Sequence, residues 1–355
     1  MFWYLVFAMV PVITSLVVSW RYKKSIKYDD KAKRTFLLWC GFAMFLIIAL
    51  RHREVGSNDS NNYYENWEFL SNFTFSELKM FMEISNFEKG YLLFVWSFSH
   101  LLPEGQFVFV LSAIIFTIAV CRYIYINSED PELSFVMFIC LGLYTFMAQG
   151  LRQSIAMSIC LFAIELAKKR KIIPFILLVL LASTFHTSAI VFTVVYFICG
   201  ISLNVRTLVM GVGITAVLLA FSSRLAAIGN MIFQREYEGE VESGGFVAVA
   251  IYAIILILSI ALAGKRRKDQ DYSFFVFMTW FGFVFYLMRY TEVQIAERIS
   301  WYFMFGQLVA LPNVLSRFDK SVSFVIKCAV IVLCFALFAY RLSGDGLVAY
   351  RFMWQ

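Results

Sequence analysis

The chain has 355 residues, of which 61% are hydrophobic and only 15% are charged, and its formal net charge is +7. A soluble domain of this size carries about 25% charged residues, so the composition excludes an ordinary soluble protein. Apolar runs recur from end to end, whereas a membrane β-barrel would show short alternating segments. The sequence therefore predicts an all-α, polytopic membrane protein, with residues 1–355 as a single transmembrane domain.

The first apolar run, 2–20, has neither a basic n-region nor a small-residue cleavage site. We therefore interpret it as a retained helix and not as a signal peptide. Further apolar runs follow along the whole chain. Together the runs are 2–20, 36–50, 90–102, 106–126, 133–148, 151–167, 172–203, 207–222, 246–263, 273–289, 298–315 and 321–340.

Positive charge in such a protein reports the orientation of its loops and not a nucleic-acid partner. Lysine and arginine concentrate in a few segments between the apolar runs, and we expect all of these segments on the cytoplasmic side. They are residues 21–34, 168–171, 265–268 and, more weakly, 317–320.

These basic segments decide how two ambiguous runs are placed. One crossing needs about 20 residues, so run 172–203 is too long for one crossing and short for two. A single crossing would force segment 168–171 or segment 265–268 to the outside. We therefore predict two short helices that turn at STFHTS, residues 183–188.

The second ambiguous run is 90–102, which reaches only about 20 Å as a helix. A crossing here would again put a basic segment outside, so we predict a re-entrant or interfacial helix on the outer side. It belongs to an outer loop, 51–105, in which residues 63–82 are expected to form an amphipathic helix on the membrane surface. The predicted topology has about 12 crossings, with both termini outside.

Several arginines fall on the outer side of this topology, which the positive-inside rule disfavours. Guanidinium groups bind phosphate oxygens in pairs and keep their charge at any local pH. A membrane-embedded diphosphate is therefore the expected ligand, although each arginine alone could also snorkel to lipid headgroups. The outer arginines are Arg51, Arg53, Arg152, Arg224, Arg235, Arg289 and Arg298.

Two residues are candidates for a general base. His186 lies within an apolar run and is flanked by small hydroxyl residues. We predict that it takes a proton from a sugar hydroxyl. A satisfied core histidine is the alternative. Asp59, in the turn-prone segment GSNDSNNYY, is the second candidate, unless it is an ordinary turn or cap carboxylate.

Other outer residues are candidates for binding a sugar. Glu88 lies at the mouth of the predicted re-entrant helix, where it either orients a sugar or caps the helix. Tyr63, Tyr64 and Tyr91 could stack on sugar rings, or could belong to an interfacial aromatic belt. The seven cysteines lack metal-ligand spacing, so we predict neither a metal nor another cofactor.

Four segments of the chain resemble, in family order, the motifs of the EpsG family of bacterial exopolysaccharide and O-antigen loci. RQSIA and FHTSA, within residues 151–189, resemble the family's RQxxA and FHxSA pair, which is fairly specific. REVGSNDSNNYY, FEKGY and ERISWYF resemble weaker family segments at 53–64, 87–91 and 297–303. The chain departs from the family pattern at Ser57 and Asn58, since the family usually has one small residue or Thr between the glycine and the aspartate.

The resemblance implies a polymerase of the Wzy-dependent pathway, a GT-C-like or O-antigen polymerase-like helical bundle in the bacterial inner membrane. Such enzymes move a growing glycan from its undecaprenyl-diphosphate carrier onto the next lipid-linked repeat unit, on the periplasmic side. Their partners are these lipid-linked oligosaccharides, the bilayer and, as an open alternative, a chain-length regulator.

Together with the residue patterns above, this resemblance implies roles for individual residues. Arg152, Arg289 and Arg298 are the expected diphosphate ligands, with Arg51 and Arg53 as weaker candidates, and His186 is the expected base. A flippase for a lipid-linked oligosaccharide is the alternative; it would place charged residues along a path through the midplane and carry a pseudo-repeat. An acyltransferase of the same pathway is a third reading, but it would need a donor route from the cytoplasm.

Overall fold

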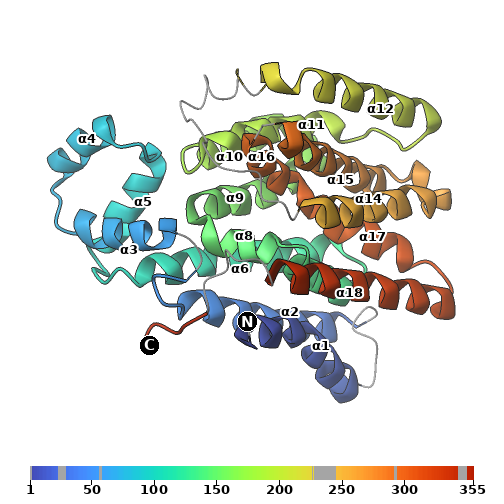
Figure 1. Cartoon of the computed structure of the whole chain (residues 1–355), viewed down its shortest axis with the longest axis horizontal. Coiled ribbons are helices and arrows are strands. Elements are labelled where there is room, and N and C mark those ends of the chain that lie inside the picture. The colour runs from blue at the N-terminus through green and yellow to red at the C-terminus, as the bar shows by residue number, and fades with distance from the viewer. Residues whose placement is uncertain are drawn as a thin grey trace.

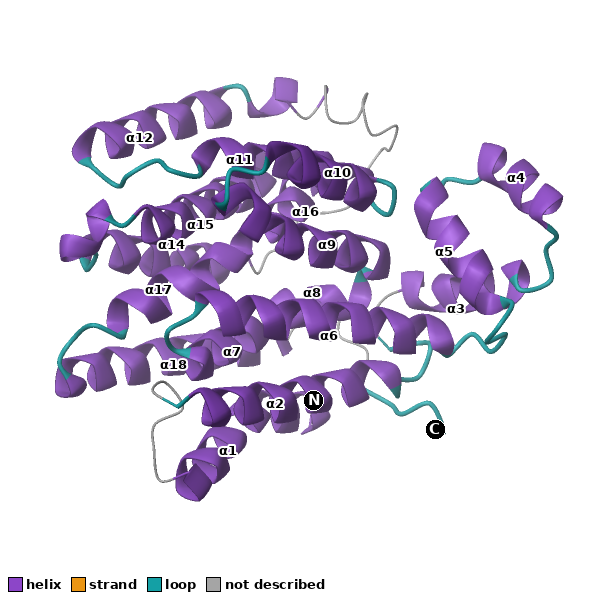
Figure 2. Ribbon diagram, turned by 180° about the vertical axis from the view of Figure 1, so that it is seen from behind, coloured by secondary structure: helices purple, strands orange, loops and turns teal. Residues whose placement is uncertain are grey.

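The computed structural model describes residues 2–22, 29–55, 58–225, 227, 245–291, 294–342 and 350–355. In these ranges the chain is helical, apart from one isolated β-bridge between Arg51 and Phe352. Most helices run roughly parallel to the long axis of the molecule, in layers from α12 at one edge to α1 at the other (Figure 2). This arrangement confirms the predicted all-α class.

The first half of the described chain contains α1 Phe2–Tyr22, α2 Asp30–Ala49, α3 Asn58–Leu70, α4 Phe75–Ile84, α5 Lys89–Ser99, α6 Phe107–Asn127, α7 Pro131–Cys140, α8 Leu143–Gln149 and α9 Leu151–Lys168. The second half contains α10 Ile172–Ser183, η1 Thr187–Thr193, α11 Val194–Ile198, α12 Val205–Ala220, α14 Gly245–Ala261, η2 Gly264–Lys268, α15 Gln270–Met288, η3 Arg289–Thr291, α16 Gln294–Phe303, η4 Met304–Gly306, α17 Gln307–Leu315 and α18 Lys320–Leu342.

Within the described residues, 4 helices are long and apolar enough to cross a membrane: α2, α6, α15 and the 321–342 part of α18. The α7–α8 pair brings the number to 5 if it counts as one bent span, and shorter apolar helices of 10–17 residues accompany them. These helices identify a multi-pass membrane protein. They supply fewer crossings than the 12 that the sequence predicts, because most of the remaining apolar helices are too short to span a core of about 30 Å in a straight line.

Run 172–203 breaks where the polar residues predict a break. α10 ends at Ser183, and η1 and α11 continue the chain from Thr187. The expected turn at 183–188 is therefore present.

Two other runs differ from the prediction. The expected amphipathic helix at 63–82 is two helices, because Thr74 and Glu77 form a capping box that starts α4 afresh. Run 133–148 is not one straight helix but bends by 55° between α7 and α8. At the bend Gly142 has a φ of 93°, and the side chain of Arg341 donates to the Leu141 carbonyl oxygen at 2.7 Å.

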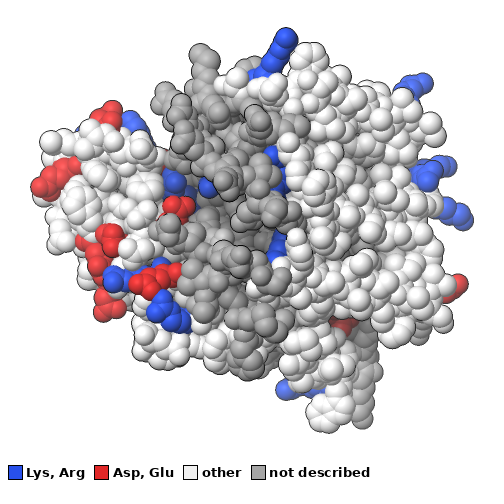
Figure 3. Space-filling view, viewed as in Figure 1, with Lys and Arg blue, Asp and Glu red and all other residues white. Residues whose placement is uncertain are grey.

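Described residues of all four basic segments meet at one end of the molecule. Lys33, Lys168, Arg266 and Arg317, one from each segment, line a single cavity, as expected for segments on one side of a membrane. At the opposite end lie α3, α4 and α5, which we call the outer lobe (Figure 1). In Figure 3 charged side chains gather on the lobe and at the basic end, and the described surface between the grey region and the basic end is largely uncharged.

The outer lobe has a small apolar core of its own. Trp67 and Tyr91 are fully buried in it, and Phe109 of α6 and Leu151 of α9 extend it into the bundle. α5 has 11 residues, about 16 Å at 1.5 Å per residue, so it is too short to cross a bilayer. The lobe is thus seated on the ends of α6 and α9, where the candidate site lies.

We expect Gly142→Ala to lower the free energy of unfolding by about 2 kcal/mol, because a positive φ strains any residue with a Cβ atom. The added Cβ would also lie 1.7 Å from Nη1 of Arg341. The thermal unfolding midpoint of the purified protein measures the effect. Gly213→Ala in α12 is the control, since nothing lies within 4 Å of its Cβ position, and an unchanged midpoint for Gly142→Ala would contradict the expectation.

Candidate functional site

The outer lobe docks on the break that follows α10. The backbone amides of Gly90 and Tyr91, at the start of α5, donate to the carbonyl oxygen of Thr184 at 3.0 and 3.2 Å. A Cβ atom at Gly90 would lie 2.2 Å from Oγ1 of Thr184, so only glycine permits this approach. The segment FEKGY is therefore in direct contact with Thr184, the residue that immediately precedes FHTSA.

Glu88 joins three parts of the site. Its carboxylate forms an ion pair with Arg152, the second residue of α9, and also accepts a hydrogen bond from the backbone amide of Thr187 at 3.3 Å. The two charged side chains are only 11% and 10% exposed. One carboxylate thus links the start of α9, the outer lobe and the turn that carries His186.

Aromatic rings enclose this ion pair. The guanidinium carbon of Arg152 lies 4.7 Å from the centre of the Phe87 ring, and the rings of Tyr63 and Tyr91 are 5.9 Å apart. Burial raises the pKa of Tyr63, although the charges of Arg152 and Arg298 and a hydrogen bond with Arg152 act in the opposite direction. The environment of the ion pair is therefore largely dry, which strengthens charged hydrogen bonds there.

His186 begins a chain of polar side chains behind the turn. Its Nδ1 lies 2.6 Å from the hydroxyl oxygen of Ser188, and that hydroxyl donates to the Tyr302 hydroxyl at 3.2 Å. A hydroxyl group has one proton, so when Ser188 donates to Tyr302 it accepts from His186, and the imidazole proton then lies on Nδ1. In this tautomer Nε2 of a neutral imidazole is the basic nitrogen. The side chain is buried, with 4% of its surface exposed.

α16 connects this region to a second cationic group. Gln153 of α9 donates to the backbone carbonyl oxygen of Arg298 at 2.5 Å, while Glu297 of the same helix pairs with Arg289 at 3.2 Å. Arg289 also donates to the Tyr286 hydroxyl at 2.8 Å and is buried. Arg152 and Arg289, both predicted from sequence, are therefore each paired with a carboxylate.

Arg341 is a half-buried cation that the sequence analysis did not single out. It donates to the Tyr252 hydroxyl at 2.9 Å, and its charge acts on Tyr286, the phenol that Arg289 contacts. The sequence contains a signal for it, since Arg341 directly follows the last apolar run, 321–340, at the end that the predicted topology places outside. Phe87 and Tyr302 also belong to the site, and both lie in segments already noted for the resemblance.

The remaining predicted residues lie around the lobe. Arg51 is 2% exposed, and it donates to the Val55 carbonyl oxygen at 2.6 Å and covers the Phe109 ring at 4.2 Å. These contacts hold the chain between α2 and α3. Arg53 is exposed and stacks over half-buried Tyr64 at 5.4 Å.

Asp59 is exposed in the first turn of α3, a position where a carboxylate stabilises the helix dipole. Arg224 is exposed beside the Phe221 ring, and Arg235 lies outside the described residues. Among the residues that the structure describes, no three histidine, cysteine, aspartate or glutamate side chains form a group suited to a metal ion.

Comparison with known proteins gives one match. A sequence model of the EpsG family matches residues 34–352, which include every motif segment noted above. Neither the curated proteins nor the solved structures contain a match.

We expect Glu88→Gln to lower the free energy of unfolding by about 3 kcal/mol, because removing one partner leaves the buried charge of Arg152 uncompensated. Thermal unfolding of the purified protein would report the loss. Glu83→Gln is the matched control, since Glu83 and Lys89 form an ion pair whose side chains are 72% and 65% exposed. Exposed pairs contribute less than about 1 kcal/mol, so equal losses in the two variants would argue against a buried, linking role for Glu88.

Proposed function

Because the chain belongs to the EpsG family, whose members are membrane proteins linked to exopolysaccharide synthesis, we propose that it is a glycan polymerase. It joins undecaprenyl-diphosphate-linked oligosaccharide repeat units on the periplasmic side of the bacterial inner membrane. The observation that carries the proposal is the position of Glu88, which holds both Arg152 and the turn of His186. Arg152, the proposed phosphate ligand, and His186, the candidate base, are thereby held on either side of the Glu88 carboxylate.

In the proposed reaction, a hydroxyl at the non-reducing end of the acceptor unit attacks the anomeric carbon of the growing chain. The bond from this carbon to the diphosphate oxygen breaks, and the lipid diphosphate leaves. Nε2 of His186 takes the hydroxyl proton, and one displacement inverts the anomeric configuration. Asp59 is the second candidate for the base.

Arg152 stabilises the charge that develops on the leaving diphosphate, with Arg298 and Arg289 as further ligands. Such stabilisation is usually the largest single contribution to catalysis. Arg152 is already paired with Glu88, so a phosphate group binds by taking the place of a carboxylate of the same charge sign. This exchange avoids a buried, uncompensated guanidinium before the substrate arrives. No step in this mechanism calls for a metal.

In this proposal, residues at or near the Arg152–Glu88 ion pair contact the sugars. Glu88, once displaced from Arg152, accepts hydrogen bonds from sugar hydroxyls, whereas Tyr63 and Tyr91 are buried in the core of the lobe and are not exposed for stacking on a sugar. Arg53 and half-buried Tyr64, which stack on each other, are further candidates for sugar contacts, while Arg51 is buried against Phe109. Both substrates are lipid-anchored, so we propose that the site opens sideways to the bilayer.

The proposed topology has about 12 crossings, with the basic segments in the cytoplasm and both termini outside. The shorter apolar segments complete the number by crossing in pairs or at an angle, namely α1, α9, α10, α11, α12, α14 and the α16–α17 segment. α5 enters the membrane without crossing it. The polymerase is favoured over a flippase because the cations of the basic end are tied together by ion pairs between helices. A transporter would have to open that end.

We predict that His186→Ala and Arg152→Ala each reduce polymer formation by at least about 100-fold in cells that lack the native copy, the range typical of losing a general base or a transition-state ligand. Chain length on a gel measures the effect, and single repeat units should accumulate on the outer leaflet. Accumulation on the inner leaflet would instead point to the flippase.

His52→Ala and His100→Ala are the matched controls, since neither histidine is buried, and both should leave the polymer unchanged. Arg152→Lys tests the geometry, because lysine keeps the charge but not the guanidinium fork. Normal long-chain polymer from His186→Ala or Arg152→Ala, with the protein present in the membrane, would refute the assigned role.

A further inference from the structure

A cavity of about 660 Å³ lies at the basic end of the molecule, away from the outer lobe. Its volume is within the range of small-molecule sites, about 300–1,000 Å³. Arg317 and Asp271 stand at its rim with side chains that are 68% and 65% exposed. The cavity is therefore accessible from the surface.

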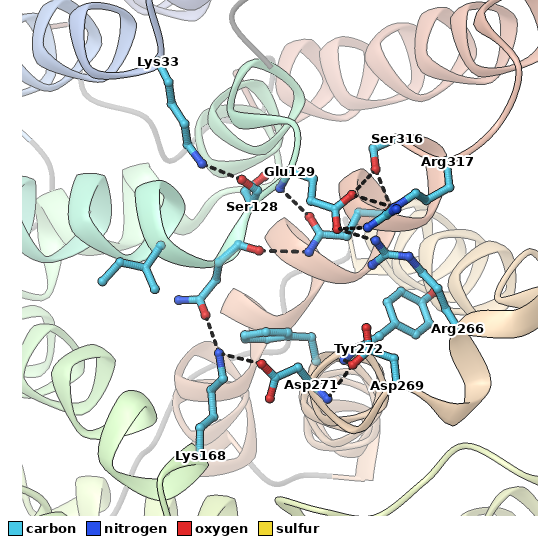
Figure 4. A pocket seen from close by; sticks show the side chains of 14 residues that line it. Lys33, Ser128, Glu129, Lys168, Arg266, Asp269, Asp271, Tyr272, Ser316 and Arg317 are labelled. Carbon is cyan, nitrogen blue, oxygen red and sulfur yellow. Dashed lines mark hydrogen bonds and ion pairs between the residues drawn. The ribbon is translucent and has the colours of Figure 1, made fainter. Parts of the chain in front are cut away.

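The charges that line the cavity are sorted into two groups, which face each other across it (Figure 4). In the first group Arg266 and Arg317 both pair with Glu129, and Lys33 donates to the Ser128 carbonyl oxygen at 2.8 Å. Two guanidinium groups thus share one carboxylate, and Lys33 adds a third cation to this group. Burial acts to raise the pKa of Glu129, but hydrogen bonds from Ser316, Arg266 and Arg317 lower it below its ordinary value.

In the second group carboxylates outnumber cations. Lys168 pairs with Asp271 at 3.2 Å and, behind the cavity lining, with Glu165 at 3.6 Å, so two carboxylates share one ammonium group. Asp269, the N-cap of α15, adds a further carboxylate to the lining. Tyr272 stands between the two groups in Figure 4.

We propose that this cavity binds a zwitterionic ligand in which a phosphate is joined to a primary amine, as in a phosphoethanolamine group. The phosphate lies against Arg266 and Arg317, whose guanidinium groups suit it, and the ammonium lies against Asp271 and Asp269. Such a group could be the headgroup of a phospholipid or part of a soluble molecule. The site does not depend on the polymerase reaction, because it uses none of the residues assigned to it.

The test uses the full-length protein purified in detergent. It is titrated with a short-chain phosphatidylethanolamine and, in parallel, with soluble O-phosphoethanolamine, while the thermal unfolding midpoint is followed. At least one of the two should raise the midpoint in a saturable way, and which of them does so identifies the source. Phosphatidylcholine, whose amine has no N–H donor, and phosphatidylglycerol, which has no cation, should bind at least about tenfold more weakly.

Arg317→Gln and Asp271→Asn remove one charge from each group, and each should raise the apparent Kd by about tenfold. Glu129 keeps Arg266 as a partner in the first variant and Lys168 keeps Glu165 in the second, so neither change leaves a buried charge without a partner and the variants should fold. Arg267→Gln and Asp319→Asn are the matched controls: both residues are exposed, nearby in sequence and outside the lining.

Binding that the two lining variants lose and the two controls keep would establish the site. The proposal is overturned if neither probe shifts the midpoint. It is equally overturned if phosphatidylglycerol or phosphatidylcholine matches phosphatidylethanolamine, or if Asp271→Asn binds as well as the parent protein.

Discussion

The buried ion pair between Arg152 and Glu88 is the contact on which the outer end of the protein depends. A guanidinium group in this dry environment needs a counter-charge, because an uncompensated buried charge is strongly destabilising. Glu88 supplies it from the outer lobe and uses its second oxygen to hold the turn after α10. The same contact therefore fixes the lobe, the start of α9 and the position of His186 relative to both.

This arrangement also separates two kinds of positive charge in the molecule. At the basic end, lysines and arginines orient the chain in the membrane and pair with carboxylates across helix boundaries. At the outer end, Arg51, Arg152 and Arg289 are buried, and an aromatic ring lies against each of them. In the proposed topology the first set satisfies a rule of membrane insertion, whereas the second opposes that rule, which is why we propose a binding role for it.

Much of this could be predicted from the sequence. The basic segments follow from charge counting, and the break at 183–188 follows from polar residues in an apolar run whose length fits neither one crossing nor two. The nearness of Arg152 and His186 follows from the hairpin between them. These features depend on neighbouring residues or on the number of crossings between the basic segments, so they can be predicted from a single sequence.

Other features depend on contacts between distant segments, and no local pattern reveals them. Glu88 was expected to cap a helix or orient a sugar, but its partner Arg152 lies 64 residues away. The division of 63–82 into two helices was missed because the apolar spacing continues through the capping box of Thr74. The bend at Gly142 was missed because the residue that stabilises it, Arg341, is 200 positions downstream of Leu141.

That bend has a consequence for how the chain assembles in the membrane. The Leu141 carbonyl oxygen is freed from regular helix geometry in an apolar setting, where an unsatisfied polar group costs several kcal/mol. Its side-chain donors, Tyr252 and Arg341, follow it by 111 and 200 residues. The full set of donors to this carbonyl therefore forms only after α14 and α18, which follow it in sequence, have packed against the bend. Until then the bend either keeps that oxygen near water or adopts a different geometry.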